Sequence, residues 1–525
     1  MESTYPTLGQ ILPDLSLQNA LTFSVGPLVL DSRQVTAGDT FVALGGTQVD
    51  GASFIDSAVK QGAALILAEG LQEDCESLAD GVHKVVVPAL REKLSAMAGR
   101  WYSNPSQTMN VVGITGTNGK TTCSHWLAEL LADPQSPAGS VGTLGYGLTG
   151  EPMTVTGMTT PDAIQTQAIL SQLHADGAKS VVMEVSSHSL DQHRVAGVAF
   201  DVAVLTNLGR DHLDYHGDMD RYVASKAQLM QFESLKAAVL NVDDPYVEVF
   251  KAALAPSVKM LSYGLREQAD FSFQQIQYSP AGVKAILVTP EGDFDVALPV
   301  WGEFNLHNIL AVVASGYALG RSVAMWVQRL PDLPSVAGRL ERVDVDADIT
   351  VLVDFAHTAD ALQSVLSAIR QHSTQRLWCV FGCGGDRDKG KRPLMAAVAE
   401  AVADHVVVTS DNPRMEEPQS IIDEVMAGFR TTAGVECIAD REAAIRHAIV
   451  NAKAGDCIVL AGKGHENYQQ IGAEKIPFSD VTVARLALQS RAEQLNESGV
   501  VKGDDVVKKS VTVKDSGSVK GVERD

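Results

Sequence analysis

Residues 113–122 read GITGTNGKTT, and this stretch decides the fold of the middle of the chain. The apolar run 109–115 that leads into it predicts a strand, and apolar residues at helical spacing over 121–132 predict a helix. A glycine-rich turn between a strand and a helix aims backbone amides and the positive end of the helix dipole at an anion, and Lys120 adds a point charge. The stretch therefore predicts a cradle for the phosphates of a nucleoside triphosphate.

The spacing of this cradle differs from the common phosphate-loop pattern G-x-x-x-x-G-K-[ST]. Ile114 stands five residues before Gly119, where that pattern has glycine. Glycines stand at Gly113 and Gly116 instead. This variant narrows the classes of nucleotide-binding protein to which the chain can belong.

The length and the charge of the chain limit its function further. A chain of 525 residues suggests about three or four domains. A net charge of −22 at pH 7 argues against wholesale binding to nucleic acid or to an acidic membrane. No basic segment leads into an apolar one at the amino terminus, and no run of 18 uninterrupted apolar residues occurs. We expect a cytoplasmic monomer with no nucleic-acid partner and no membrane insertion.

Strand and helix patterns alternate in three blocks, at 1–107, 108–331 and 332–493. The expected strands are 40–44, 64–68, 180–185, 202–206, 237–241, 349–354, 377–381, 405–409 and 457–460, and the expected helices of the third block are 359–370, 391–403 and 418–430. Such alternation gives parallel sheets covered by helices. A tail at 494–525 is predicted to be disordered, because its scattered valines cannot bury enough area to offset the entropy of ordering.

Two residues of the second block are candidates for a functional role next to the phosphates. Glu184 ends one predicted strand and His212 follows the next, so both can face the crevice at the carboxyl ends of a parallel sheet. Magnesium takes few protein ligands beside phosphate oxygens and water, so Thr121 and Glu184 are credible ligands. His212 is a less typical magnesium ligand.

Lys226 lies on the same predicted helical stripe as Tyr222 and Leu229, at spacings i, i+4 and i+7. Partial desolvation of this lysine would favour its neutral amine. A neutral amine can add carbon dioxide to form a carbamate, which is an anionic oxygen ligand suited to magnesium. The alternative is a lysine stem that lies along an apolar face with its ammonium in water, and that is the more frequent arrangement of such a residue.

A series of motifs runs in order along most of the chain. They are TGTNGKTT at 115, TTPDA at 159, EVSSHSLDQHR at 184, TNLGRDHLDYHG at 206, GEFNLHN at 302, AGRLE at 337, FAHTADAL at 355, FGCGGDRDKGKRP at 381, DNPR at 411 and GKGHENYQ at 462. Together with Lys226 this order resembles the Mur ligases, the ATP-dependent amide-forming family of peptidoglycan precursor synthesis, over roughly residues 28–490. Each motif alone is weak, whereas their joint order is specific.

The resemblance implies three α/β domains and a reaction in two steps. Block 1–107 would bind the UDP-N-acetylmuramoyl group, 108–331 would be a central P-loop ATPase domain with a parallel sheet, and 332–493 a Rossmann-like domain for the amino acid. The terminal phosphoryl group of ATP passes to the D-glutamyl carboxylate of the substrate and gives an acyl phosphate. An incoming amine then displaces phosphate and forms an amide.

The resemblance also implies the residues of the ATP site. The catalytic residues would be Lys120, Glu184, His212 and Lys226, and the ATP contacts Gly116, Thr117, Asn118, Gly119, Lys120, Thr121, Thr122, Asn305, His307, Asn308, Arg339, Asp354 and His357. One Mg²⁺ would use Thr121 and Glu184, and a second would use Glu184, His212 and a carbamate on Lys226, which makes that residue N6-carboxylysine. Phe355 and Ala359 depart from the family, which usually has tyrosine and proline there.

The nucleotide-sugar substrate, UDP-N-acetylmuramoyl-L-alanyl-D-glutamate, needs contacts of its own. By resemblance they are Leu30, Ser32, Thr47, Gln48 and Val49 at the uridine diphosphate end, and Thr159, Thr160, Ser186, Gln192 and Arg194 at the muramoyl peptide. Met158 stands where the family usually has asparagine, so that contact is expected to be missing or replaced. Without the family, Ser32 would be interpreted as a turn former and Arg194 as a surface charge.

The motif at 411–414 resembles the signature of family members that add meso-diaminopimelate. The contacts with this amino acid would be Arg387, Asp411, Asn412, Pro413, Arg414, Gly462 and Glu466. A planar guanidinium at Arg414 offers bidentate recognition of a distal carboxylate, which lysine lacks, and Glu466 suits the distal ammonium. Locally, DNPR is only a strand-to-turn signal.

Three alternatives stay open at the level of the sequence. A lysine-adding ligase of the same family is disfavoured by Arg414. Folylpolyglutamate synthetase shares the cradle and the lysine carbamate but neither the first block nor DNPR. A non-catalytic relative with an assembly role is disfavoured because Lys120, Glu184, His212 and Lys226 are all retained.

Overall fold

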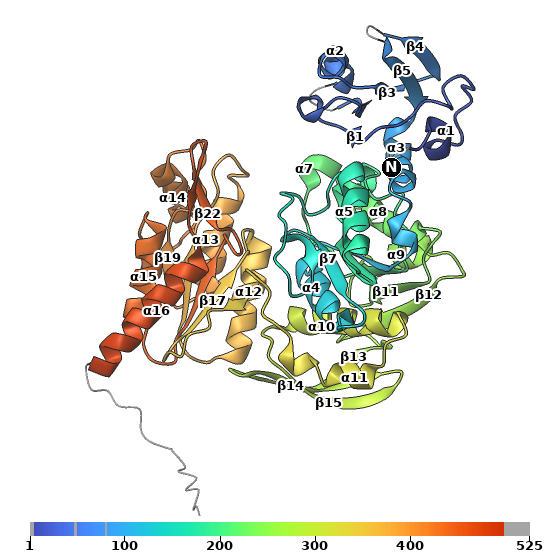
Figure 1. Cartoon of the computed structure of the whole chain (residues 1–525). Coiled ribbons are helices and arrows are strands. Elements are labelled where there is room, and N and C mark those ends of the chain that lie inside the picture. Colours follow the sequence, from blue (N-terminus) through green and yellow to red (C-terminus); the bar gives the residue numbers. More distant parts are fainter. Residues whose placement is uncertain (1–4, 47–49, 79–80, 498–525) are drawn as a thin grey trace, which may run out of the picture.

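The structure is a computed structural model that describes residues 5–46, 50–78 and 81–497. Three α/β units follow one another along the chain, coloured blue, cyan to yellow, and orange to red in Figure 1. The α/β class and the parallel sheets expected from the sequence are confirmed. Within the described residues, no helix has both the length and the apolar character needed to cross a bilayer.

The first unit is a five-stranded sheet in the order β1-β2-β3-β5-β4, in which only β4 is antiparallel to its neighbour. Its strands are β1 (Leu28–Val29), β2 (Thr40–Ala43), β3 (Leu65–Gly70), β4 (Asp74–Ser77) and β5 (His83–Pro88), and its helices are α1 (Leu8–Ile11), α2 (Ile55–Lys60) and α3 (Leu90–Trp101). The end of α3 leads directly into the second unit (Figure 1).

The second unit is a seven-stranded sheet in the order β12-β11-β10-β6-β9-β7-β8, in which only β8 is antiparallel. Its strands are β6 (Asn110–Thr115), β7 (Ala138–Gly142), β8 (Gly145–Leu148), β9 (Ser180–Glu184), β10 (Val202–Leu205), β11 (Ala237–Asn241) and β12 (Lys259–Tyr263). Its helices are α4 (Lys120–Leu131), α5 (Ala163–Ala175), α6 (Ser187–Asp191), α7 (Leu213–His216), α8 (Met219–Ala227), α9 (Val247–Ala253), α10 (Glu303–Ala318) and α11 (Val323–Val327). Because β6 lies between β9 and β10, the loop after β6 is flanked by the residues that follow both neighbours.

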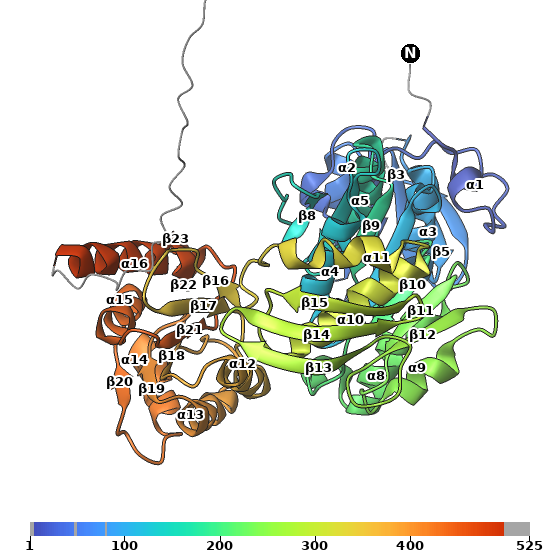
Figure 2. The same cartoon turned by 90° about the horizontal axis from the view of Figure 1, so that it is seen from below.

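A three-stranded antiparallel sheet that the sequence analysis did not predict covers α10. It consists of β13 (Ser272–Ser279), β14 (Gly282–Thr289) and β15 (Gly292–Leu298), and Figure 2 shows it beneath α10 and α11. Its apolar residues, such as Phe273 and Leu287, share one core with Leu306 and Leu310 of α10. The sheet therefore supports the helix from the side away from the nucleotide cradle.

The third unit is a six-stranded sheet in the order β16-β17-β21-β18-β19-β20 with an added hairpin, β22-β23. Its strands are β16 (Glu341–Arg342), β17 (Thr350–Asp354), β18 (Leu377–Phe381), β19 (His405–Val408), β20 (Val435–Cys437), β21 (Cys457–Ala461), β22 (Tyr468–Ile471) and β23 (Glu474–Pro477). Its helices are α12 (Ala359–His372), α13 (Lys391–Val402), α14 (Pro418–Met426), α15 (Arg441–Asn451) and α16 (Asp480–Glu497).

Helix α16 corrects the expected start of the tail. Residues 494–497, predicted to be disordered, continue this helix because Gln494 and Leu495 are good helix formers that extend it without a breaker. The rest of that tail, 498–525, lies outside the described residues.

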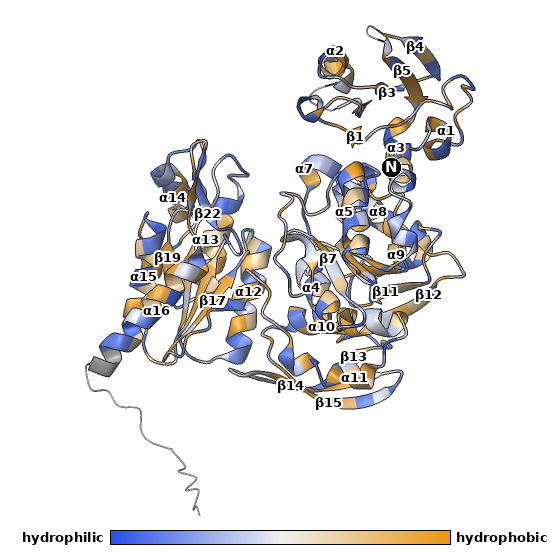
Figure 3. Cartoon of the chain, in the orientation of Figure 1, coloured by the Kyte–Doolittle hydropathy of each residue, from blue (hydrophilic) through white to orange (hydrophobic). Residues whose placement is uncertain are grey.

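The central strands of the sheets are apolar on both faces, as is typical of parallel sheets covered by helices. Every residue of β9, β10 and β11 is buried, and Figure 3 shows the strands β11 and β17 in hydrophobic colours. Loops at the carboxyl ends of these strands are thus held by a rigid core.

His372, the last residue of α12, joins the third unit to the second. The Gly302 amide, at the start of α10, donates to His372 Nε2 at 2.9 Å. His372 Nδ1 lies 2.8 Å from the Ser279 carbonyl oxygen, which can only accept. The Trp301 ring stacks on the imidazole at 4.8 Å. These contacts require the neutral imidazole with its proton on Nδ1, and burial lowers the pKa of His372 in the same sense.

Candidate active site

The loop between β6 and α4 has the backbone shape that only glycine permits at two positions. Gly116 has φ 144° and Gly119 has φ 85°. A Cβ on Gly116 would collide with Thr206 Oγ1, and one on Gly119 with Asn308 Oδ1. The Thr206 hydroxyl in turn donates to the Asn118 carbonyl oxygen at 2.6 Å. The loop is therefore held close to β10 and α10, with the amino end of α4 open to a ligand.

Two lysines converge on one carbonyl oxygen of this loop. Lys120 Nζ donates to the Gly116 carbonyl oxygen at 2.9 Å and to that of Thr117 at 3.0 Å. Lys226 Nζ donates to the same Gly116 oxygen at 2.8 Å. Neither lysine forms a salt bridge with a carboxylate of the described residues. Lys120 therefore has no carboxylate partner among these residues and can turn its charge to an incoming anion.

Lys226 is in the environment that its predicted carbamate requires. Its side chain is 1% exposed, and its Nζ lies 4.8 Å from the centre of the Tyr222 ring. Burial, and then repulsion from Lys120, lower the pKa of Lys226 well below its ordinary value. The neutral amine is thus favoured, so the residue fits the modification chemically, and the lysine with its ammonium in water is not what the structure shows.

Glu184 and Thr121 bring oxygen atoms together beside the loop. The Thr121 hydroxyl donates to Glu184 Oε2 at 3.0 Å. Thr143 donates its backbone amide to Oε1 at 2.9 Å and its hydroxyl to Oε2 at 3.1 Å. A hydroxyl and a buried carboxylate next to a phosphate cradle suit Mg²⁺, which completes its shell with phosphate and water. The predicted Thr121 and Glu184 pair therefore fits the ion.

The structure does not bring His212 into that oxygen pair. His212 Nε2 lies 3.4 Å from Asp211 Oδ2, and its ring meets the rings of His188 and Tyr222, with centroids 4.9 and 6.2 Å away. The Tyr222 ring that it meets is also the ring that Lys226 Nζ approaches, at 4.8 Å from its centre. Among the described residues no group of three or more His, Cys, Asp or Glu side chains is arranged to hold a metal. Its role as a ligand stays a prediction.

The sequence analysis did not predict the histidine cluster around His212. His188 lies 5.5 Å from His216 and 4.2 Å from Tyr215, between ring centroids. Burial, followed by repulsion from His212 and His216, lowers the pKa of His188 to about 4. His188 is therefore neutral at physiological pH and adds no positive charge beside the cradle.

The first turn of α10 carries the three residues expected to meet the nucleotide. Asn308 Nδ2 donates to Asn305 Oδ1 at 3.0 Å, and both side chains are buried under the loop. His307 Nε2 lies 2.9 Å from Asp243 Oδ2 at the end of β11. The two asparagines thus support the loop from below, whereas His307 lies at the rim of the sheet.

Arg339 of the third unit reaches across to the cradle. Its Nη2 donates to Thr121 Oγ1 at 3.4 Å, and its guanidinium lies 4.9 Å from the centre of the Phe355 ring. The phenylalanine that departs from the family therefore keeps an aromatic face for Arg339 while it lacks a hydroxyl. Asp354 accepts from the Leu340 and Ala356 amides at 2.7 and 2.8 Å, and burial raises its pKa.

The other two residues of this segment have local contacts. His357 Nδ1 lies 2.8 Å from the Phe355 carbonyl oxygen. Ala359, the second departure, is the first residue of α12, whose cap is Thr358. Proline is favoured at the first position of a helix because its φ is fixed, and alanine has a high helix propensity at any position. The start of the helix is therefore preserved.

The residues expected to hold the muramoyl peptide form one connected group. The Thr160 hydroxyl donates to the Glu184 carbonyl oxygen at 2.8 Å and accepts from the Ser186 amide at 3.1 Å. Arg194 donates to Gln192 Oε1 at 2.6 and 3.0 Å and to the Thr160 carbonyl oxygen at 3.0 Å. Through Thr160, this group is hydrogen-bonded to the backbone of Glu184.

Thr159 and Met158 complete that group. Thr159 Oγ1 lies 3.1 Å from Thr143 Oγ1. Met158 contributes its sulfur, 3.6 Å from Arg194 Nη1, in place of the amide that the family has there. A thioether sulfur is a weaker acceptor than an amide oxygen, and that the family contact is missing or replaced stays a prediction.

The uridine diphosphate contacts are only partly described. Ser32 begins a short 3₁₀ helix after Asp31 and is buried, and its carbonyl oxygen accepts from Gln61 at 2.7 Å. Leu30 is half-buried beside it. Thr47, Gln48 and Val49 lie outside the described residues.

Three loops, which follow β18, β19 and β21, bring the predicted amino-acid contacts together. Asn412 Nδ2 donates to Glu466 Oε2 at 2.8 Å, and the Gly385 amide donates to the Asn412 carbonyl oxygen at 2.9 Å. Arg414, at φ 51°, donates from Nη1 to the Gly385 carbonyl oxygen at 2.7 Å. These contacts hold Arg414 beside the loop that carries Arg387.

The remaining predicted contacts surround the same loops. A Cβ on Gly384 would lie 2.8 Å from Arg414 Nη1 and 3.9 Å from Arg387 Cγ, so both arginines flank this glycine. A Cβ on Gly462 would lie 2.6 Å from Asp411 Oδ2, which requires glycine there. Pro413 is buried between them. Arg387 is exposed, and its Nη1 donates to the Asp386 carbonyl oxygen at 3.2 Å.

Two further residues missed by the sequence analysis organise these loops. Arg392 is 0% exposed and binds Glu416 at 2.9 Å and Glu424 at 2.7 Å. Its hydrogen bond to Glu416, followed by that from the Asp386 amide, lowers the pKa of Glu416 to about 2. Lys463 is 0% exposed and binds Glu466 at 3.1 Å. Both lie inside recognised motifs, KGKRP and GKGHE, and a charged residue within a motif of small residues was the signal available.

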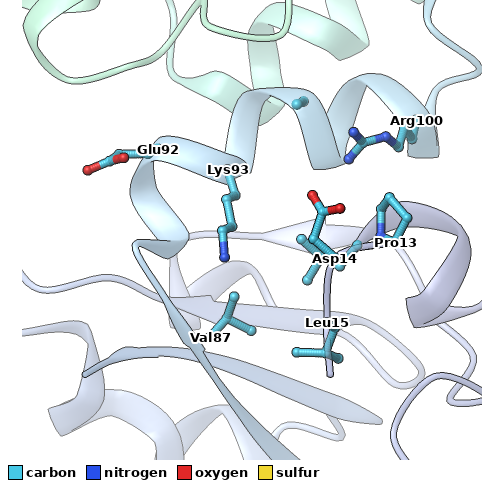
Figure 4. Close-up of a pocket in the computed structure, with 9 residues that line it drawn as sticks. Pro13, Asp14, Leu15, Val87, Glu92, Lys93 and Arg100 are labelled. Carbon is cyan, nitrogen blue, oxygen red and sulfur yellow. The ribbon is translucent and has the colours of Figure 1, made fainter. Parts of the chain in front are cut away.

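Cavities away from these loops do not coincide with the predicted contacts. One of about 210 Å³ in the first unit is lined by Asp14, Lys93 and Arg100 between α1 and α3 (Figure 4). A second of about 480 Å³ lies beside α7 and α8, with His216 and Arg221 on its walls. The first mixes both signs of charge and includes none of the predicted residues.

Three family models match the chain in succession. They are the Mur ligase family catalytic domain over 27–102, the Mur ligase middle domain over 114–316 and the Mur ligase glutamate ligase domain over 338–464. The chain belongs to the Mur ligase family. This Mur ligase is thus an ATP-dependent, amide-forming enzyme.

Individual relatives of this Mur ligase extend over nearly its whole length. A UDP-N-acetylmuramoyl-L-alanyl-D-glutamate–2,6-diaminopimelate ligase of Pseudomonas putida is 46% identical over 469 residues, which are 88% of this chain and 94% of that protein. A solved structure of a ligase with that name is 36% identical, with a TM-score of 0.70 over 93% of this chain and 99% of the other. A MurF ligase of Thermotoga maritima, solved with ADP, is 22% identical with a TM-score of 0.60 over 90% and 98%, and shows the fold alone.

Proposed function

We propose that this Mur ligase joins meso-diaminopimelate to UDP-N-acetylmuramoyl-L-alanyl-D-glutamate at the expense of ATP. The observation that carries the proposal is the placement of Arg414 and Arg387 on both sides of Gly384, in the same loop cluster as Glu466. Guanidinium groups suit a distal carboxylate and a carboxylate suits a distal ammonium, so the cluster matches an amino acid that has both. The relatives that carry this name support it.

We assign the three units to the three substrates. Residues 1–107 would hold the UDP-N-acetylmuramoyl group, 108–331 would bind ATP, and 332–493 would bind the amino acid, with Arg339 reaching from the third unit to the ATP site. The reaction would take place in the cytoplasm, where ATP is available. Folylpolyglutamate synthesis is a weaker candidate, because it gives the first unit no substrate.

The cradle can hold and polarise the phosphates of ATP. The loop amides would bind them, and Lys120 would exchange its bonds to the Gly116 and Thr117 carbonyl oxygens for phosphate oxygens. Phosphoryl transfer depends more on positioning and charge neutralisation than on covalent help. At an effective dielectric near 20, each unit-charge pair at about 4 Å contributes about 4 kcal/mol. This is the scale on which Lys120 offsets repulsion between the substrate carboxylate and ATP.

Thr121 and Glu184 would hold one Mg²⁺, and Glu184, His212 and a carbamate on Lys226 a second. When bound, the ions would neutralise negative charge on the phosphoryl and acyl oxygens. Lys226 keeps its amine neutral in a buried site, and Thr143 holds both oxygens of Glu184 in place. The Glu184 carboxylate would thus already be held in place when the substrates bind.

The amino-acid cluster would position the amine for attack. Arg414 and Arg387 would hold the distal carboxylate, and Glu466 the distal ammonium. The amino group at the other end of diaminopimelate would then be directed to the acyl phosphate. The amine displaces phosphate and loses a proton, which gives the amide.

The test is release of phosphate by purified protein with ATP, the UDP-muramoyl dipeptide and diaminopimelate, each omitted in turn. We expect release only when all three are present, together with a product heavier than the dipeptide by one diaminopimelate less water. Phosphate release without the dipeptide, or no release at all, would contradict the proposal and favour a different substrate or a non-catalytic role.

A further inference from the structure

Lys463 is a buried cation that the reaction described above does not use. It follows β21 directly, and its side chain is 0% exposed. Its Nζ donates to Asn412 Oδ1 and to Glu466 Oε2, both at 3.1 Å. It also lies 5.6 Å from the centre of the Tyr468 ring. Such a lysine is too deep to touch a ligand, so its effect must pass through the residues that it binds.

Asn412 is fixed by this lysine and by the hairpin. Its Oδ1 accepts from the Gln470 amide at 2.9 Å as well as from Lys463, and its Nδ2 donates to Glu466 Oε2 at 2.8 Å. The two donors to Oδ1 determine which end of the amide is oxygen. The amide therefore presents Nδ2 to Glu466 and cannot turn over without losing both bonds.

Glu466 is held by one of its two oxygens. Oε2 accepts from Lys463 and Asn412, whereas the contact of Oε1 among the described residues is the Tyr468 hydroxyl at 3.5 Å, at the outer limit of a hydrogen bond. The Glu466 side chain is 18% exposed, so it is partly accessible. One oxygen thus anchors the carboxylate and the other is left for a ligand.

We propose that Lys463 is a positioning residue that sets the preference for an amino acid with a distal ammonium. It holds Asn412 and Glu466 as one unit, so that Glu466 Oε1 faces the second ammonium of diaminopimelate. This inference rests on the proposed function and deepens it, because it assigns recognition of the ammonium and of the distal carboxylate to different parts of the loop cluster.

The test compares two amino acids that differ only in the distal ammonium. Meso-diaminopimelate has it, and 2-aminopimelate keeps one amino group and both carboxylates but lacks it. A hydrogen bond to a charged group corresponds to a preference of about tenfold to a hundredfold, so we expect the wild-type enzyme to prefer diaminopimelate by that factor in kcat/KM. In Lys463→Met the preference should fall to about threefold or less, because efficiency with diaminopimelate drops while that with 2-aminopimelate is kept.

The matched control is Lys475→Met on strand β23. Lys475 is exposed, and its Nζ lies 4.1 Å from the centre of the same Tyr468 ring. The substitution therefore removes an ammonium near the hairpin that, among the described residues, forms no salt bridge with Glu466. It should keep the wild-type preference. The KM for ATP should be unchanged in both variants, and Lys463→Leu, which also removes the donor, replaces the methionine variant if that one does not fold.

The outcomes separate the inference from the proposed function. A wild-type preference that survives in the Lys463 variants, or an equal fall in efficiency with both amino acids, overturns the positioning role alone. No turnover of diaminopimelate by the wild-type enzyme overturns the proposed function, and this inference with it. In a double-mutant cycle, Glu466→Gln and Lys463→Met should be non-additive, because both act on one contact.

Discussion

The phosphate cradle of the second unit and the amino-acid cluster of the third use buried lysines in opposite ways. Lys120 and Lys226 share one backbone carbonyl oxygen, with no salt bridge to a described carboxylate. Lys463 is equally buried but is paired with Glu466. The first region thus has a positive charge on Lys120 that no described carboxylate pairs with, whereas Glu466 balances the positive charge of Lys463 in the second.

This difference corresponds to the charges of the ligands. A polyphosphate brings negative charge, which the cradle can neutralise, and burial makes each interaction stronger than in water. Diaminopimelate has ammonium and carboxylate groups in equal number, so its site needs direction rather than net charge. We therefore expect substitutions in the cradle to abolish chemistry and substitutions in the amino-acid cluster to change the choice of substrate.

The largest effect is expected from Lys120→Ala. Loss of the phosphate clamp should lower kcat by about a thousandfold or more, the scale of losing a charged transition-state contact. The fold should be unchanged, because Lys120 makes only hydrogen bonds to its own loop. Steady-state phosphate release and urea unfolding measure the two effects. Near-normal release would show that the cradle does not act through its charge.

Lys226→Ala should lower kcat by about a hundredfold, and added acetate or formate should restore part of it by filling the vacated ligand position. The same change at Lys236, a lysine that is 75% exposed and paired with Asp201, should do neither. Carbon-13 NMR of enzyme supplied with labelled bicarbonate tests the carbamate directly. An unmodified Lys226 amine in fully active enzyme would show that activity does not require the carbamate.

Arg414→Ala should act on the other region. It removes a hydrogen-bonded charge, which costs about 1.5 to 3 kcal/mol, so the KM for diaminopimelate should rise by about tenfold to a hundredfold or somewhat more. The KM values for ATP and the dipeptide should be nearly unchanged. Arg485→Ala, at an exposed position of α16, is the control. Equal effects on all three substrates would erase the distinction between the regions.

The smallest effect concerns His372, which joins the third unit to the second. Burial lowers the pKa of this histidine in the folded protein below its value in the unfolded chain. As pH falls below about 6.5, the unfolded chain therefore binds a proton that the folded protein does not, and the free energy of unfolding decreases. His372→Gln, which cannot take up that proton, should reduce the difference in unfolding free energy between pH 7.5 and 5 by about 1 kcal/mol. His174→Gln, at an exposed position, should leave the difference as in wild type. Identical pH dependence in both variants would exclude this role for His372.

Much of the fold follows from local patterns. The strands at 237–241 and 377–381 were predicted with their observed bounds, since apolar runs between turn signals are strong indicators of buried parallel strands. The antiparallel sheet over 272–298 was missed, although apolar residues that alternate with polar ones and the turns at PAG and PEG were available in the sequence.

The site was harder to predict because its contacts join distant segments. The sequence indicated that Lys226 is partly desolvated, but its bond to Gly116 depends on how α8 packs against the loop after β6. Thr143 and Lys463 orient other residues, and their contacts with Glu184 and Asn412 join segments that are distant in the sequence. The roles of His212 and of the segment 47–49 stay predictions.

A competition experiment tests the central claim most directly. Purified enzyme is given ATP, the UDP-muramoyl dipeptide and equal concentrations of meso-diaminopimelate and L-lysine, and the two products are counted by mass spectrometry. Lysine would leave Arg414 and Arg387 without an anion, so the account predicts a diaminopimelate product in excess by about a hundredfold to ten-thousandfold. Comparable amounts of both products, or an excess of the lysine product, would contradict it.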